Sequence, residues 1–169
     1  MDEHRLGLQP VVRREWVDEY SNAIAKINWR FQWLWLYGFV HPNSGETYWW
    51  ILPLVNEKIF SQVLEDFAQY YQLGKQKRVL LILDQAGWHL SKKVKIPEGI
   101  HLHCIPPHSP ELQPAERLWP LTNEAIANRC FSSLDELEEL LFKRCQKLFL
   151  EKDLIKGLTK FYWWPRESS

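Results

Sequence analysis

Residues 79–84 read Val-Leu-Leu-Ile-Leu-Asp, a continuous apolar run that ends in an acid. An apolar run without alternation is typical of a strand that is buried on both faces, as in a parallel sheet. Ligands of open α/β sheets bind at the carboxyl ends of such strands, and Asp84 stands at this end. The run therefore predicts an α/β fold with a functional edge at Asp84, although an Asp here also commonly caps the following turn.

Further extended segments lie on both sides of this run. Aromatic residues alternate through residues 29–40, and residues 46–55 return after a turn rich in polar residues, Pro and Gly, which predicts a hairpin. Pro53 should lie at the end of the second strand or on a sheet edge. Residues 1–17 contain an extended piece, and residues 100–105 form another short strand.

Helical spacing alternates with these strands. A helix should begin after Asn56 as its N-cap and stop at Gly74. Residues 114–129 look helical, with an interruption or restart at Pro120. A Ser-x-x-Glu capping box at residues 133–136 opens the last helix. A hairpin-rich start followed by alternating strands and helices predicts an α/β protein with a mixed sheet and helices on both faces.

Composition narrows the class of protein further. The length of 169 residues suits one domain, and 21 basic residues balance 21 acidic ones, so nothing draws the whole chain to nucleic acid. No apolar run reaches the roughly 18 residues of a membrane span, and the N-terminus is not a signal segment, so we expect no membrane partner. Three cysteines without a CxxC spacing indicate a reduced, cytoplasmic protein.

Two motifs carry a family resemblance. LDQAGWH at residues 83–89 and IPPHSPELQPAERLW at residues 105–119 together resemble the DDE transposases of the mariner type, most of all their bacterial insertion-sequence branch. That family reads roughly LDNAxxH and PPYSPxLNPIExxW. This sequence departs from it at Gln85, His108 and Gln113, and none of these changes removes a carboxylate. The resemblance implies a ribonuclease-H-like fold, a mixed five-stranded sheet with the acids at its centre.

The resemblance also implies a catalytic carboxylate triad of Asp2, Asp84 and Glu116, the first in a short upstream strand. We expect these acids to hold two Mg²⁺ ions, with Mn²⁺ as a substitute, because hard cations prefer oxygen ligands. Family members hydrolyse DNA at element ends and then attack target DNA with the freed 3′-hydroxyl. The expected function is therefore a metal-dependent DNA endonuclease and transposase that acts on double-stranded DNA, both element ends and target.

Several side chains near the Asp84 strand are candidates for DNA contact. They are Trp88, His89, Lys92, Lys93, Lys95 and Arg117. Cations would bind phosphates, and Trp88 could stack on an unpaired base. Each has a plainer interpretation, because cations also suit a solvated loop and His89 suits a hydrogen-bonded loop histidine. His101 and His103 share a strand face, but a third zinc ligand is missing nearby.

The family normally carries a helix-turn-helix DNA-binding region before the catalytic domain. We expect that region to be absent here, so that residues 1–169 form a single catalytic domain with Asp2 at a frayed terminus. One interpretation is a catalytic domain that forms a homodimer and is completed by a separate N-terminal DNA-binding chain. The alternative is a catalytically silent, truncated remnant that folds, dimerises or interferes, and a third is a different nuclease of this fold. Pairing of residues 1–8 in the sheet would favour the first.

Overall fold

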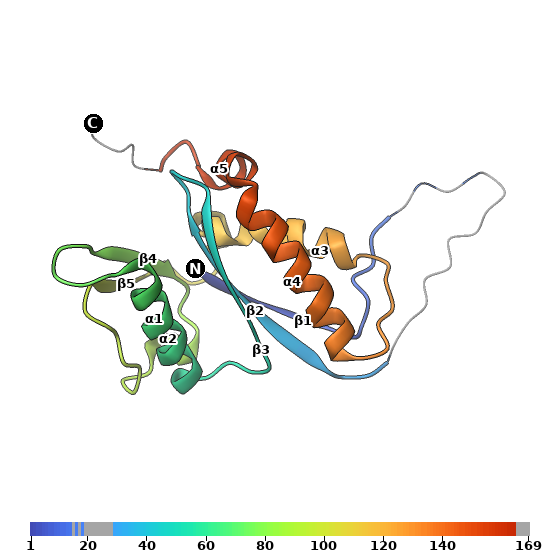
Figure 1. The fold of residues 1–169 in the computed structure, drawn as a ribbon, viewed down its shortest axis with the longest axis horizontal. Helices are drawn as coiled ribbons and strands as arrows, with labels where there is room; N and C mark the ends of the chain where they lie inside the picture. Colours follow the sequence, from blue (N-terminus) through green and yellow to red (C-terminus); the bar gives the residue numbers. More distant parts are fainter. Residues whose placement is uncertain (15, 17, 19–28, 165–169) are drawn as a thin grey trace.

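The computed structural model of the chain describes residues 1–14, 16, 18 and 29–164 (Figure 1). Its strands and helices follow in the order β1 (Asp2–Gly7), β2 (Trp33–His41), β3 (Glu46–Leu52), α1 (Glu57–Tyr71), β4 (Val79–Leu83), α2 (Gly87–Leu90), β5 (Ile100–Cys104), the 3₁₀ turns η1 (Pro110–Leu112) and η2 (Pro114–Leu118), α3 (Trp119–Ile126), α4 (Leu134–Leu150) and α5 (Lys152–Thr159). This order confirms the predicted mixed α/β architecture and adds α5, which the sequence patterns did not reveal.

The five strands hydrogen-bond as two sheets. β1, β2 and β3 form an antiparallel sheet in that order, and β4 pairs in parallel with β5. The amino group of Met1 donates to the carbonyl oxygen of Ile82 at 2.7 Å, which ties the start of β1 to β4. A single hydrogen bond does not make β1 and β4 paired strands. The expectation of one five-stranded sheet is therefore corrected to a three-stranded and a two-stranded sheet that touch at Met1 and Ile82.

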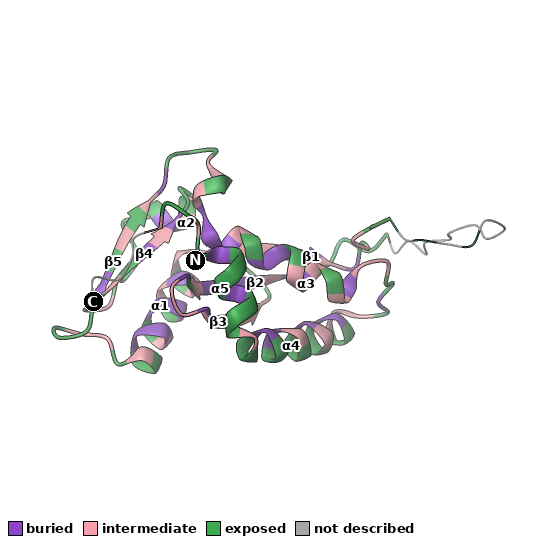
Figure 2. Cartoon of the chain, turned by 90° about the horizontal axis from the view of Figure 1, so that it is seen from above, coloured by how far each residue is buried: buried purple, intermediate pink, exposed green. Residues whose placement is uncertain are grey.

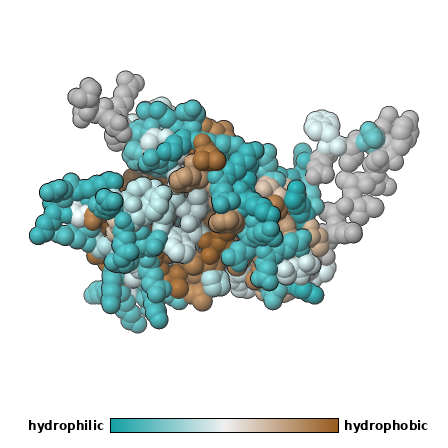
Figure 3. Space-filling view, in the orientation of Figure 1, coloured by the Kyte–Doolittle hydropathy of each residue, from teal (hydrophilic) through white to brown (hydrophobic). Residues whose placement is uncertain are grey.

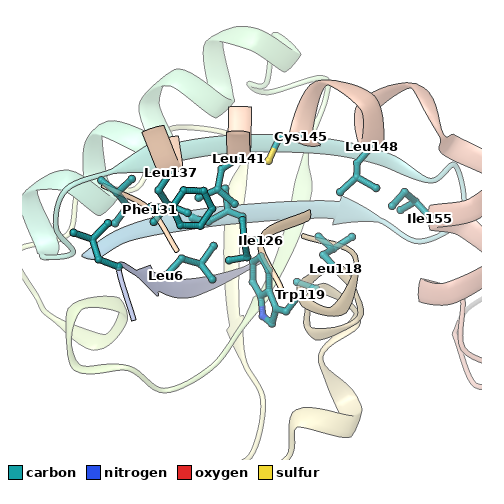
Figure 4. Close-up of a cluster of buried hydrophobic side chains, with 14 residues drawn as sticks. Leu6, Leu118, Trp119, Ile126, Phe131, Leu137, Leu141, Cys145, Leu148 and Ile155 are labelled. Carbon is teal, nitrogen blue, oxygen red and sulfur yellow. The ribbon is translucent and has the colours of Figure 1, made fainter. Parts of the chain in front are cut away.

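Helices cover both faces of the three-stranded sheet. Successive side chains of β2 point to opposite faces, and both faces carry apolar residues that need to be buried. Leu34 and Leu36 belong to a core cluster that includes residues of α3, α4 and α5 (Figure 4). Tyr37 and Phe39 belong to a second cluster with α1, β4 and β5. Figure 2 shows that α4 is amphipathic, with buried residues on the side toward the sheet and exposed residues on the other side. The predicted placement of helices on both faces is confirmed.

The ends of α1 follow local chemistry. The Asn56 side chain accepts a hydrogen bond from the Ile59 N–H at 2.8 Å, which confirms the predicted N-cap. The helix stops at Gln72, which takes the left-handed conformation with φ 54°, so the predicted stop at Gly74 is wrong. Gly74 has a different role, because a Cβ on Gly99 would lie 2.5 Å from the Gly74 nitrogen and the two backbones pack closely.

Two other predicted boundaries shift. β2 begins at Trp33 rather than at residue 29, and Phe31 before it is 73% exposed, so this aromatic stretch lacks the burial that a paired strand would give it. The segment that contains Glu116 is a 3₁₀ turn, and α3 begins after it with Pro120 in its first turn. The restart at Pro120 is confirmed, since proline suits a first helical turn. β3 ends immediately before Pro53, as predicted.

The start of α4 departs from a reciprocal capping box. The Ser133 hydroxyl accepts from the Glu136 N–H at 3.3 Å, as predicted. The Glu136 carboxylate, however, accepts from the N–H and hydroxyl of Ser132 at 2.9 Å and 2.8 Å. The predicted N-cap is therefore correct, and the returning hydrogen bonds come from the preceding residue.

Cys104, Cys130 and Cys145 are all unpaired thiols. In the part of the chain that the structure describes, no helix has both the length and the apolar character that a membrane crossing requires.

Candidate active site

Three segments that are distant in the sequence bring acids to one pocket. Asp2 begins β1, Asp84 directly follows β4, and Glu116 lies on the η2 turn. All three line a cavity of about 370 Å³ whose wall also includes Gln113 and residues 105–110. The structure thus brings together the three carboxylates that the sequence singled out.

Asp2 is held firmly in the sheet. It pairs with Gly38 across β1 and β2 and is only 9% exposed. Its Oδ2 accepts a hydrogen bond from Trp119 Nε1 at 2.9 Å, and its Oδ1 accepts from the Glu3 N–H at 2.9 Å. The expectation of a frayed Asp2 is therefore wrong, because strand pairing and a buried indole donor fix the carboxylate.

Gly38 makes room for this arrangement. A Cβ at Gly38 would lie 2.8 Å from the ring carbon Cη2 of Trp119, well inside van der Waals contact. The missing side chain lets the Trp119 ring lie against β2, from where its N–H reaches Asp2. The hydrogen bond to a predicted catalytic acid therefore depends on a glycine in the neighbouring strand.

Glu116 responds to the other two acids. Burial raises its pKa to about 7, helped by the charge of Asp2, a hydrogen bond with Asp2 and the charge of Asp84. Carboxylates that converge in a partly desolvated site resist simultaneous ionisation. At neutral pH, Glu116 is therefore partly protonated unless a cation joins the cluster.

Asp84 is oriented by its own loop. Its Oδ1 accepts from the Ala86 N–H at 3.0 Å and lies 2.8 Å from Nδ1 of His89 in α2. The other ring nitrogen of His89, Nε2, lies 2.9 Å from Oε1 of Glu3. The two acids thus hold opposite sides of one imidazole ring.

The protonation of His89 follows from these contacts. Burial by itself lowers the pKa of His89, but the hydrogen bond and charge of Glu3 and the charge of Asp84 outweigh it and raise the pKa. A neutral imidazole has one N–H, whereas the charged form donates from both nitrogens. The imidazolium satisfies both carboxylates at once, and this explains the direction of the shift.

The two aromatic candidates for DNA contact face inward. The His89 side chain has no exposed surface, and the Glu3 side chain is 3% exposed. Trp88 is half-buried, with its Nε1 3.4 Å from Glu3 Oε1 and its ring against Trp35. His89 is therefore a buried, hydrogen-bonded histidine. The expectation that His89 contacts DNA directly is corrected, because its side chain has no exposed surface.

The basic candidates lie at the surface. Lys92, Lys93 and Lys95 are exposed in the loop that follows α2, where Lys93 lies 3.9 Å from Glu57. Arg117 is exposed beside Glu116 and its guanidinium stands over the Phe161 ring at 5.5 Å. These side chains remain accessible to phosphate groups.

The donor set of the pocket is suited to a hard cation. It offers three carboxylates, and the buried Oε1 of Gln113 has no hydrogen-bond partner among the described residues, while its Nε2 donates to the Met1 carbonyl oxygen. Within those residues, however, no three acidic, His or Cys side chains converge closely enough to enclose an ion. An ion here would need other oxygen ligands. His101 and His103 are exposed and belong to no such cluster either.

Sequence reasoning missed two residues of this site. Alternation along a strand predicts that Glu3 points to the face opposite Asp2, and the structure places His89 on that face, 2.9 Å from Glu3. Trp119 ends the second motif, so its position in that motif was the available signal for a role. Neither contact could be inferred from spacing, because each joins elements more than eighty residues apart.

Fold and pocket together define the class, an α/β protein in which carboxylates from three separate segments line one pocket. The family model of the DDE superfamily endonucleases matches residues 1–138. An uncharacterized protein of Sinorhizobium fredii (strain NBRC 101917 / NGR234), y4pE/y4sA, is 34% identical over 106 residues, which are 62% of this chain and 77% of the relative. The chain belongs to the DDE superfamily endonucleases.

Solved structures of the mariner transposase Mos1 have a similar fold. The strand transfer complex superposes with a TM-score of 0.59 at 18% identity, and the pre-cleavage transpososome with 0.60 at 17%. Each match covers 96% of this chain, which spans 55% and 56% of the two Mos1 chains. The expected ribonuclease-H-like fold of the mariner type is therefore confirmed.

Proposed function

We propose that this chain is a transposase catalytic domain that cleaves DNA at the ends of an insertion sequence and joins them to target DNA. The observation that carries the proposal is that Asp2, Asp84 and Glu116 line one pocket, with the pKa of Glu116 raised to about 7. Solved Mos1 complexes with a transposon end, and with Mn or Mg, support DNA and a divalent cation as the expected partners.

Asp2, Asp84 and Glu116 are the residues that would hold the two Mg²⁺ or Mn²⁺ ions, with phosphate and water oxygens as further ligands. When bound, such ions activate the attacking water or 3′-hydroxyl and stabilise the leaving oxygen. The chain's own contribution is positioning. Trp119 fixes Asp2, His89 and the Ala86 N–H fix Asp84, and Glu116 is the acid that must lose its proton before it can act as a ligand.

Lys92, Lys93, Lys95 and Arg117 would contact the DNA backbone, because they are exposed around the loop and turn that carry Asp84 and Glu116. We also propose that the chain acts as a homodimer. The half-buried Trp88 is the candidate for base stacking, which would require its ring to leave Trp35.

A second candidate function is a folded but catalytically silent protein. One observation favours it: no three ligands converge on a single point among the described residues. It would retain the fold and bind DNA or a transposase without cutting.

The test is cleavage of a labelled DNA duplex with Mn²⁺ or Mg²⁺, compared between the wild type, Asp84→Ala and Glu116→Ala. We expect cleavage only by the wild type and only with metal, with unchanged circular dichroism for all three proteins. Glu111→Gln serves as the control, because Glu111 is exposed and outside the cavity. Cleavage retained in both Ala variants would overturn the site, and an inert wild type that still binds Mn²⁺ would favour the silent protein.

A further inference from the structure

A groove of about 1100 Å³ runs along the outer side of β3, between α1 and α4. We call it the β3 groove; its lining residues are Tyr48–Ile51, Asp66, Tyr70, Asp135, Glu138, Glu139, Phe142, Cys145, Gln146, Phe149 and Leu150. Figure 3 shows apolar and weakly polar surface between two hydrophilic flanks, at the place where β3 lies between these helices in Figure 1. The groove lies apart from the pocket of the three acids, with which it shares no lining residue.

The backbone of β3 is open toward this groove. The Leu8 N–H donates to the Gln32 carbonyl at 3.0 Å, which fixes the side of β2 that bonds to β1. Hydrogen-bonded pairs alternate along an antiparallel ladder, so Tyr37 and Phe39 of β2 direct their backbone groups toward β3. Their register partners are Trp50 and Tyr48.

Trp49 and Ile51 alternate with Tyr48 and Trp50 along β3. Their backbone N–H and C=O groups therefore point away from β2. β3 is the last strand of its sheet, and no described strand pairs with its outer side. An exposed strand edge is a template for another extended chain. The floor of the groove thus offers backbone donors and acceptors, and its walls offer aromatic and aliphatic contacts.

The charged residues that line the groove are all acidic. Asp66, Asp135, Glu138 and Glu139 line it, and no Lys or Arg does. Glu139 forms an ion pair with Lys143, and Asp66 accepts a hydrogen bond from Tyr48, whereas Asp135 and Glu138 have no ion-pair partner among the described residues. Acidic walls attract a segment of opposite charge and repel nucleic acid.

We propose that the β3 groove binds an extended, Lys- or Arg-bearing segment of a partner protein, which adds to β3 as a further strand. Main-chain hydrogen bonds to Trp49 and Ile51 would give affinity, and the acidic wall would select basic side chains. A second copy of this chain would fit the groove poorly. Its own β3 also lies between two helices, and the four acids of its groove would face the four acids of this one.

The probe is a capped peptide of about nine residues with alternating Lys and Val, which lies within the usual range of strand lengths. Its partner probe replaces every Lys by Glu. Titration calorimetry should show roughly tenfold or greater preference for the Lys peptide. Amide shifts in heteronuclear NMR spectra should centre on Trp49 and Ile51.

Two N-methylated forms of the Lys peptide test the strand geometry, one methylated at every Val amide and the other at every Lys amide. Alternate residues of a strand direct their N–H groups to opposite edges. One form must therefore lose roughly tenfold or more in affinity, and the other must bind much as the parent does.

The paired substitutions Asp135→Lys and Glu138→Lys should reverse the preference between the Lys and Glu peptides. Glu98→Lys is the matched control, because Glu98 is exposed and lies outside the groove. Equal binding of both peptides, equal loss in both methylated forms, or amide shifts away from β3 would overturn the proposal. The proposal would also be overturned if the NMR signals of the Trp49 and Ile51 amides shifted on dimerisation at high protein concentration or on addition of a DNA duplex.

Discussion

Glu3 and His89 are 86 positions apart in the sequence, and Glu3 Oε1 lies 2.9 Å from His89 Nε2 in the folded chain. Both side chains are buried, and the opposite ring nitrogen of His89 contacts Asp84. The pair therefore couples the strand that carries Asp2 to the loop that carries Asp84. Outer partners of this kind orient the groups that bind a ligand.

Glu3→Gln should lower the pKa of His89, because the amide keeps the shape of the carboxylate but not its charge. A raised histidine pKa gives stability that is complete below the unfolded pKa and is lost as the pH rises through the folded pKa. The variant should therefore be less stable than the wild type by roughly 1–3 kcal/mol at pH 5, and the difference should shrink toward pH 9. NMR titration of His89 and urea unfolding at both pH values measure these effects.

Glu98→Gln is the control for this substitution, since Glu98 is exposed. An unchanged His89 pKa in Glu3→Gln would show that the contact between the two side chains does not form in solution.

Glu116→Gln should also gain stability relative to the wild type as the pH rises, but from equality at low pH to an advantage at high pH. A carboxyl whose pKa rises from 4.5 to about 7 on folding gives stability that is complete below 4.5 and is lost as the pH rises through 7. With EDTA present, the variant should match the wild type near pH 4 and exceed it at pH 8 by roughly 1–2 kcal/mol, because Glu116 is only half-buried. Urea unfolding at both pH values checks this, with Glu111→Gln as the exposed control. A difference that does not change with pH contradicts the clustering of the three acids.

Trp119→Phe removes the N–H that binds Asp2 but keeps an aromatic ring in the core. We expect a loss of roughly 1–3 kcal/mol in the free energy of unfolding, because a buried carboxylate loses a donor. We also expect weaker Mn²⁺ binding, measured by calorimetry, because Asp2 is less firmly oriented. Trp163→Phe, at a partly exposed position, is the control for removal of an indole. Equal effects of the two changes would argue against a specific role of the Trp119 hydrogen bond.

Gly38→Ala should destabilise the fold by roughly 1–3 kcal/mol, because the new Cβ meets the Trp119 ring. Gly87→Ala is a close control, since a Cβ at Gly87 meets nothing within 4 Å. Thermal or urea unfolding of both variants measures the contrast. If both alanines have the same effect, the tight contact between β2 and Trp119 is not present in solution.

Local patterns in the sequence determined much of the fold. Alternation and apolar runs located β3, β4 and β5, and cap residues such as Asn56 and Ser133 located helix starts, because these signals depend on neighbours a few residues away. The eight residues of α5, with Gly157 among them, were too few for the helix to be singled out from its pattern. The left-handed stop of α1 fell on Gln72, while the backbone of Gly74 packs against Gly99.

The sequence also determined which acids to examine, because two motifs and a short upstream match named Asp2, Asp84 and Glu116. Only the tertiary structure decided what surrounds them. It places Trp119 on Asp2 and the Glu3–His89 pair behind Asp84, and it produces the burial and the neighbouring acids that raise the pKa of Glu116. It also decided that the strands form two sheets and that β3 keeps an open edge. The physical reason is that these properties depend on distance and desolvation between elements far apart in the chain, which spacing along the sequence does not encode.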